Sequence, residues 1–164
     1  GGGFDPGYNG QTAVDEAAHI IVAAELDNTA PDVNWLLPMI QSIKDNLDEL
    51  PELGLADAGY RSEGNLQDAP IELVVALGRE GKAHAEVDAR RYPHTAAMAA
   101  KLKTDEGQAA YRKRKWIAEP PNGWIKNVLG FRQFSMRGLH RVRAEWKLVC
   151  LALNLRRMGN MLAD

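Results

Sequence analysis

The sequence has few of the residues from which common metal sites and covalent-catalysis sites are built. Cys150 is its one cysteine, which excludes an internal disulfide framework and a cysteine-based zinc site. No HExxH spacing occurs among the four scattered histidines, so a zinc hydrolase is not supported. Glycine-rich nucleotide-binding motifs and the GxSxG motif are absent as well. Metal–carboxylate chemistry is the class of catalysis that remains.

Long apolar runs are also missing. No stretch approaches the roughly 20 apolar residues that span a bilayer, and the opening GGGFDPGYNG is neither basic nor apolar, as a signal peptide would be. The 164 residues, 45% hydrophobic and 26% charged, suit one domain with its own core. We therefore expect a cytosolic protein with a reduced thiol. The three glycines at the start and the lack of an initiator methionine suggest a fragment of a longer chain.

The net charge of −2 hides a strong asymmetry between the two halves of the chain. Residues 1–80 hold 15 acidic and three basic side chains, a net charge of −12. Residues 81–164 hold 17 basic and seven acidic side chains, a net charge of +10. Such a split indicates contact with a polyanion, since solubility alone does not require this excess of cations in half a chain.

The alternation of apolar runs and turn residues predicts an α/β layered fold. In the first 80 residues we expect strands over 8–15, 19–26, 53–56 and 71–77, a helix over about 32–49, and a short helix over 62–69 capped by Ser62. The second half is expected to be helical, with a loop over 82–94 and helices over 95–103, 104–118 and 138–160. Pro120 and Pro121 should end the helix before them, and Cys150 and Leu151 should widen the apolar stripe of the last helix.

Two carboxylates are candidate metal ligands. Asp57 follows a short buried strand, at the end where open α/β sheets bind ligands, although a turn or helix cap is the alternative role. Glu119 follows four consecutive cations at 112–115, which favour its charged form; a simple salt bridge to them is its alternative. Lys126 lies two helical turns beyond Glu119, so on one helix the two side chains would share a face.

The basic residues of the second half are candidate phosphate contacts. Aromatic residues interleave with them and either stack on bases or fill the core; for Trp124 and Trp146 we favour the core. The alternative for the cations is a solvated helix face, and Arg143 and Lys147 belong to the same basic side of the last helix. The candidate DNA-binding residues are Arg112, Lys113, Arg114, Lys115, Lys126, Arg132, Arg137 and Arg141.

Three stretches resemble the carboxyl-terminal part of the bacterial DDE-type insertion-sequence transposases. They are GYNGQTAVDEAAHIIVAAE at 7–25, LADAGYRSEGNL at 55–66, and AYRKRKWIAEPPNGWIKNVLGFRQFSMRGLHRVRAEWKLVCLALNLRRM at 110–158. The resemblance implies an RNase H-like core, a mixed sheet with flanking helices, in a protein that cuts DNA and joins it to a target. It also implies a bacterial, nucleoid-associated protein with transposon ends and target DNA as partners. Whether the protein forms a homodimer is left open.

The resemblance further implies a site of two aspartates and one glutamate that hold two Mg²⁺ or Mn²⁺ ions. By resemblance Asp57 is the second aspartate, Glu119 is the glutamate, and Lys126 is the lysine two turns later. The first aspartate would lie on a strand upstream of Gly7, and no aspartate near the start of this chain matches it.

We therefore expect one incomplete catalytic domain over residues 1–164. Its parts would be an α/β core at 1–80, a helical insertion at 81–118, and the glutamate-bearing and terminal helices at 119–164. Without the first core strand and the first acid, this chain alone is not expected to transpose DNA. A non-catalytic DNA-binding remnant is the alternative function, and a nuclease of the same fold is a third reading that the missing acid equally disfavours.

Overall fold

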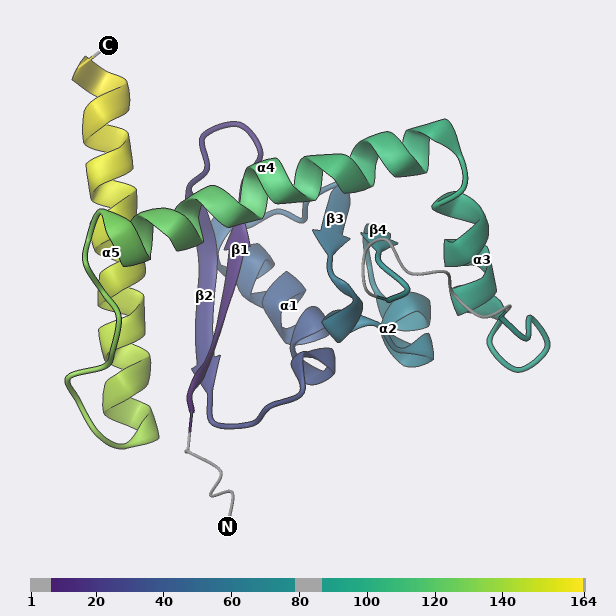
Figure 1. Ribbon diagram of the computed structural model, residues 1–164, viewed down its shortest axis with the longest axis horizontal. Helices are drawn as coiled ribbons and strands as arrows, with labels where there is room; N and C mark the ends of the chain where they lie inside the picture. The colour runs from purple at the N-terminus through teal and green to yellow at the C-terminus, as the bar shows by residue number, and fades with distance from the viewer. Residues whose placement is uncertain (1–6, 79–86, 164) are drawn as a thin grey trace. The chain divides into compact units, whose positions relative to one another are not determined.

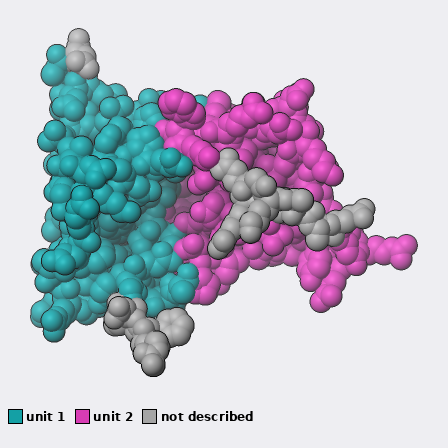
Figure 2. All heavy atoms as spheres, viewed as in Figure 1, with its two compact units in different colours: residues 1–30, 117–164 teal, residues 31–116 magenta. Residues whose placement is uncertain are grey.

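The computed structural model describes residues 7–78 and 87–163 (Figure 1). Within them the chain forms two separate two-stranded sheets and five α-helices, so the expected α/β class with a helical carboxyl-terminal region is confirmed. The chain divides into two compact units (Figure 2): unit 1 joins residues 1–30 to 117–164, and unit 2 holds residues 31–116. The three-part division expected above stays a prediction, and residues 82–86 of the loop expected over 82–94 lie outside the described residues.

Unit 1 begins with an antiparallel hairpin. Strand β1 (Asn9–Val14) pairs with strand β2 (Ile21–Asp27), and the register sets the first residue of β1 opposite the last of β2. Asp15 ties the turn between them, because its carboxylate accepts hydrogen bonds from the backbone N–H groups of Ala18 and Ile20 at 2.8 and 2.6 Å. Both strands and their antiparallel pairing confirm the expected hairpin.

Helix α5 (Leu139–Ala163) lies beside this hairpin (Figure 1) and stabilises it by packing against it. Its buried side chains recur at three and four residues and pack with Ile21 and Leu26 of β2. A Cβ atom on Gly10 would lie 3.1 Å from the Trp146 indole, so the glycine allows the helix to approach β1 closely. The buried residues of α5 are Val142, Trp146, Cys150 and Leu153.

Leu151 does not belong to this stripe, which corrects the expected width of the apolar face. Half of Leu151 is exposed, because one residue turns an α-helix by about 100° and carries its side chain away from the face that Cys150 occupies. Cys150 itself is buried, and that burial raises the pKa of its thiol to about 12.

Unit 2 is built on a parallel pair of strands. Strand β3 (Leu53–Ala56) runs beside strand β4 (Glu72–Val75), with the last residues of the two strands opposite each other. The 3-10 helix η2 (Ala58–Tyr60) and helix α2 (Glu63–Asp68) make the crossover between them. The Ser62 hydroxyl accepts a hydrogen bond from the backbone N–H of the third residue of α2 at 3.0 Å, so the expected cap is confirmed.

Two further helices complete the core of unit 2. They are helix α1 (Leu36–Leu47), which the 3-10 helix η1 (Asp32–Trp35) precedes, and helix α3 (Pro93–Lys101). The first turn of α3 is held by Glu63, whose carboxylate accepts from the backbone N–H groups of His94 and Thr95. The buried side chains of this core are Leu36, Ile40, Ala56, Leu73, Val75 and Met98.

Helix α4 (Asp105–Asn127) is longer than the sequence predicts. Its start agrees, since the Thr104 hydroxyl accepts from the Gly107 N–H at 3.0 Å. The expected end near residue 118 is wrong, because one helix continues through Pro120 and Pro121. Residues 105–116 of α4 belong to unit 2 and residues 117–127 to unit 1.

The two prolines remain in the helix because packing compensates for the hydrogen bonds that they remove. Proline's fixed φ is itself helical, so the loss is that of two N–H donors and of space near the preceding carbonyls. Pro121 is fully buried, so its ring adds to the packing of this part of the helix. Within the described residues, no helix has both the length and the apolar character that crossing a membrane requires.

The Asn154 side chain connects α5 to the edge of the hairpin. Its Oδ1 accepts from the Ile21 N–H at 2.9 Å, and its Nδ2 donates to the Ile21 carbonyl at 2.8 Å. The amide thus occupies the place of a neighbouring strand and satisfies two backbone groups beside the core.

We expect Asn154→Ala to lower the free energy of unfolding by about 1–3 kcal/mol, because two backbone groups beside the core lose their partner. Urea unfolding followed by circular dichroism measures this change. Asn160→Ala, an exposed position on the same helix, is the control and should change stability little. Equal stability of the two variants would contradict this account of Asn154.

Candidate metal and nucleic-acid site

Asp57 lies where the sequence places it, at the carboxyl end of a strand. It follows Ala56, the last residue of β3, in a parallel pair whose two strands end side by side. Its Oδ1 accepts from the Gly59 N–H at 2.8 Å, so Asp57 also caps η2. Asp57 therefore lies at the end of the strand and also has the capping role that was its alternative. The hydrogen bond from Gly59 orients its carboxylate.

A second carboxylate, that of Asp32, approaches the same turn. A Cβ atom on Gly59 would lie 2.9 Å from Oδ2 of Asp32 and 3.0 Å from Oδ1 of Asp57, so only glycine leaves room between the two side chains. Burial, together with the negative charges of Asp32 and Asp57, raises the pKa of Tyr60. Sequence reasoning assigned Asp32 only to a helix start, because α1 and β3 lie between it and Asp57 in the chain and their approach leaves no local pattern.

Asn65 holds this arrangement together. Its buried side-chain amide donates to the Val33 carbonyl at 2.7 Å and to the Tyr60 carbonyl at 2.8 Å. The first carbonyl belongs to η1 and the second to η2, the two turns that carry Asp32 and Asp57. Sequence reasoning missed this residue as well, because its partners are backbone atoms that side-chain identity does not reveal.

Glu119 and Lys126 both lie on α4, within unit 1, and both side chains are exposed. Seven residues of α-helix are two turns, so the side chains share one face at a rise of roughly 10 Å. Asp57 belongs to unit 2, so the pairing of its carboxylate with Glu119 stays a prediction. Across residues 7–78 and 87–163, no group of three or more acidic, histidine or cysteine side chains is arranged to hold a metal ion.

Several of the basic residues stabilise the protein itself. Arg143 donates through Nε to the Leu26 carbonyl at 2.6 Å and lies 3.7 Å from the Asp27 carboxylate. Lys147 pairs with Glu25 at 2.8 Å. These two contacts attach α5 to β2, so the basic side of α5 expected from the sequence is partly an internal set of ion pairs.

The four cations at 112–115 differ in their exposure to solvent. Arg114 is half-buried, and its guanidinium lies 5.5 Å from the centroid of the Tyr111 ring. Arg112, Lys113 and Lys115 are exposed, and Trp116 beside them exposes 78% of its surface. Position 114 is therefore the least accessible cation of this run.

Four of the predicted DNA contacts in unit 1 are exposed and make no hydrogen bond or ion pair with any other residue that the structure describes. One is at the end of α4, two are in the segment between α4 and α5, and one is in the first turn of α5. We call them the free cations: Lys126, Arg132, Arg137 and Arg141.

The segment between α4 and α5 combines half-buried and exposed side chains. Phe131 and Phe134 pack edge to face, with their ring centroids 5.1 Å apart, and both lie 6.3 Å from Trp146. Arg132 and Arg137 are exposed. These two phenylalanines are partly buried side chains that pack against the core of unit 1.

Glu145 of α5 fixes the middle of this segment. Its carboxylate accepts from the Ser135 hydroxyl at 2.6 Å, the Ser135 N–H at 2.8 Å and the Met136 N–H at 3.0 Å. The hydroxyl, followed by the Ser135 N–H, holds the pKa of Glu145 below its ordinary value of 4.5. Gly130 and Gly138 bracket the segment at φ of 68° and 88°, values that favour glycine.

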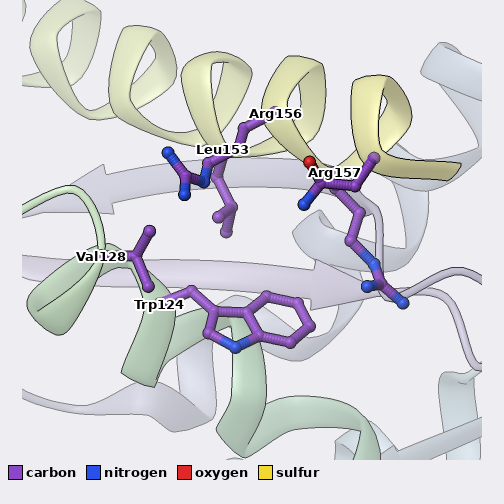
Figure 3. Close-up of a pocket in the computed structure, with 6 residues that line it drawn as sticks. Trp124, Val128, Leu153, Arg156 and Arg157 are labelled. Atoms are coloured by element: carbon purple, nitrogen blue, oxygen red, sulfur yellow. The ribbon is translucent and has the colours of Figure 1, made fainter. Parts of the chain in front are cut away.

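A shallow hollow of about 240 Å³ opens on unit 1 (Figure 3). Trp124 and Val128 line one side, and α5 contributes Leu153, Arg156 and Arg157 to the other. The Arg157 guanidinium lies 5.0 Å from the Trp124 ring centroid, and its Nε donates to the Ala18 carbonyl at 2.8 Å. The half-buried Trp124 therefore borders the core, as expected, and forms part of a basic surface.

A protein-family model described as "Transposase DDE domain" matches residues 1–155. The matched range includes Asp57, Glu119, Lys126 and the remaining candidate DNA contacts, and it ends within α5. No curated protein and no solved structure matches the chain.

The lowered pKa of Glu145 predicts a pH-dependent stability. A carboxyl group with a depressed folded-state pKa stabilises the protein above its unfolded-state pKa, and this contribution is lost as the pH falls through the folded-state value. Glu145→Gln should therefore lower the melting temperature at neutral pH, with the difference from wild type disappearing in acid. Melting curves across pH measure it, with the exposed Glu49→Gln as control; a difference that persists in acid would contradict the assignment.

Proposed function

The chain belongs to the transposase DDE domain family, and we propose that it forms part of a metal-dependent catalytic domain that cleaves DNA strands and joins them to a target. In this proposal Asp57 and Glu119 are metal ligands. Lys126 and the other free cations bind the phosphates of transposon-end and target DNA. The observation that carries the proposal is the place of Asp57 at the carboxyl end of a parallel strand in a chain that matches this family.

The chemistry of the donors supports magnesium or manganese. Carboxylate oxygens are the hard ligands that Mg²⁺ and Mn²⁺ favour. Oδ1 of Asp57 accepts from Gly59, and Oδ2 is the oxygen that remains for a metal. When bound, a pair of such ions activates the attacking oxygen and neutralises the charge on the leaving oxygen.

The residues of this chain then have separate tasks. The Gly59 N–H orients the Asp57 carboxylate, and Asn65 keeps the surrounding turns in place. Lys126, on the same helix face as Glu119, places a positive charge two turns from the glutamate, where it would neutralise a phosphate beside the metal site. The role of Glu119 depends on its pairing with Asp57 across the two units.

We further propose that the first aspartate of the site comes from a strand outside these 164 residues. Among the described residues, β1 pairs only with β2, and β3 pairs only with β4. An interior strand of a sheet has two neighbours, so each pair retains an edge whose backbone groups can accept another strand. A central strand that carries the missing acid would meet this requirement.

A non-catalytic DNA-binding protein is the second candidate function. The free cations favour it, because they lie on unit 1 and are exposed whether or not a metal site forms. Phosphate contacts of this kind give affinity without sequence specificity.

The catalytic proposal predicts no strand transfer by the 164-residue chain alone, and Mg²⁺- or Mn²⁺-dependent activity once the upstream reading frame is included. In that longer protein, Asp57→Asn and Glu119→Gln should each reduce the rate at least about 100-fold, since a metal ion contributes several kcal/mol to the transition state. Chelation with EDTA should abolish cleavage. Glu106→Gln, an exposed acid at the start of α4, is the control and should leave the rate unchanged.

The outcomes of this experiment separate the two candidate functions. Robust strand transfer from the 164 residues alone would overturn the proposal that the first aspartate lies outside them. Salt-dependent DNA binding without activity in the longer protein, unaffected by both acid substitutions, would favour the DNA-binding candidate.

The free cations predict a specific salt dependence of DNA binding. Arg132→Ala, Arg137→Ala and Arg141→Ala should each weaken binding on any DNA sequence and reduce the slope of log K against log salt by about 1. Fluorescence anisotropy across a salt series measures the slope. Lys44→Ala, which changes an exposed lysine of unit 2, is the control. An equal reduction of the slope by Lys44→Ala would show that the net charge of the protein, and not the free cations, sets the affinity for DNA.

A further inference from the structure

Helix α4 contains a glycine that its own fold does not require. Gly123 lies inside the helix, where glycine is the least favourable residue after proline. A Cβ atom on Gly123 would enter open space, with no neighbouring segment within 4 Å, and its φ does not lie in the left-handed range. Gly107, the other glycine of α4, differs, because a Cβ atom there would collide with the Lys101 carbonyl. No contact or backbone angle among the described residues therefore explains Gly123.

Gly123 lies on the exposed side of α4, between Glu119 and Lys126. At about 100° and 1.5 Å per residue, Gly123 is about 6 Å along the axis from Glu119 and turned about 40° from it. Lys126 follows about 4.5 Å further along and is turned about 60° from Gly123. Pro121 and Ile125, the buried residues of this part of the helix, point the opposite way. The position without a side chain therefore lies between a candidate metal ligand and a free cation.

Asn122 is the other residue of this exposed side between Glu119 and Lys126. Its side chain donates a hydrogen bond to the Ala118 carbonyl at 3.1 Å. Because that carbonyl lies one turn earlier, the amide lies along the helix and does not project from it. Over the roughly 10 Å between Glu119 and Lys126, one folded-back side chain thus covers the helix backbone, and position 123 adds none.

The charges at the two ends of this surface indicate which kind of molecule approaches it. Glycine occurs where a ligand or another backbone must come close to the chain. A protein segment placed here would remove water from the Glu119 carboxylate and the Lys126 ammonium, which costs free energy unless both are paired. The phosphates of a DNA strand pair with Lys126 and with a cation held by Glu119. A DNA strand is therefore the occupant that fits this surface.

We propose that Gly123 is a substrate-contact position, at which the sugar–phosphate backbone of the cleaved DNA strand crosses α4 between Glu119 and Lys126. The inference rests on the proposed function for the identity of this substrate. The missing Cβ atom lets the strand approach the helix, and this approach sets how far a phosphate lies from the Glu119 carboxylate. A side chain at position 123 would hold the strand away from Glu119 without disturbing the fold.

The stability of Gly123→Ala is the first test, because this substitution should help the fold and harm the function. It should raise the melting temperature of the 164-residue chain by roughly 1–4 °C, since alanine is the better helix former and its Cβ atom enters open space. A lower melting temperature would show that the fold itself needs glycine here, which would overturn the inference.

The rate of DNA cleavage is the second test, in the longer protein that includes the upstream reading frame. Gly123→Ala should slow Mg²⁺-dependent cleavage, and Gly123→Leu should slow it at least about 100-fold, because a displacement of about 1 Å at the reacting atoms has an effect of that size. Ala97→Leu, which adds the same bulk at an exposed position of α3, is the control and should leave the rate unchanged. Wild-type rates in both Gly123 variants would contradict the proposed contact.

Alkylation of an introduced thiol tests the contact without requiring catalysis. With a short DNA duplex at about ten times the Kd of the variant, iodoacetamide should modify Gly123→Cys roughly tenfold more slowly than without DNA, because most of the protein is then bound. The buried Cys150, whose pKa is raised, should not react. Ala97→Cys is the control and should react at the same rate with and without DNA.

These outcomes separate the failure of this inference from the failure of the proposed function. Protection of Gly123→Cys by DNA, in a protein whose longer form does not cleave DNA, would support the strand contact while the catalytic proposal fails. Cleavage that depends on Asp57 and Glu119, together with an unprotected thiol at position 123, would overturn the contact alone. A chain that binds no DNA would overturn both.

Discussion

A pair of strands cannot hold itself together in water, and the rest of this structure depends on how each pair is covered. In unit 1 the cover is α5, whose Trp146 indole lies so close to Gly10 that a Cβ atom there would be crowded. A two-stranded sheet without such a helix is marginal at best. The contacts of Arg143, Lys147 and Asn154 with β2 then set the helix in one register on the strand. These contacts decide which basic residues of the helix remain available to a ligand.

The same requirement in unit 2 determines where its candidate metal ligand lies. The parallel strands β3 and β4 must be joined by a crossover, and that crossover starts at Asp57 and passes through Gly59 and Asn65. The carboxylate at the strand end and the amide that supports it are therefore consequences of one connection. Asp32 arrives at the same turn because η1 leads into α1, which covers the pair of strands.

Much of this architecture could be predicted from the sequence, because the elements carry local signals. The hairpin, β3 with its terminal aspartate, the Ser62 cap and α5 follow from periodicity and turn residues. Three features could not be predicted. Pro120 and Pro121 remain inside α4 because the burial of Pro121 outweighs the lost hydrogen bonds, and a pair of prolines carries no local sign that one of them is buried. Arg143 and Lys147 cannot be told from free cations without their distant partners. Asp32 and Asn65 act through contacts between turns that lie far apart in the chain.

The hydrogen bonds between Glu145 and the segment before α5 affect the entropy of the proposed binding to DNA. Arg132 and Arg137 are carried by a backbone that aromatic packing and three hydrogen bonds hold in one conformation. A flexible loop that binds a phosphate must first give up its conformational freedom, which weakens the net affinity. Here the protein's own folding has already imposed that order, so in the proposed binding of DNA phosphates only the two arginine side chains would lose conformational freedom.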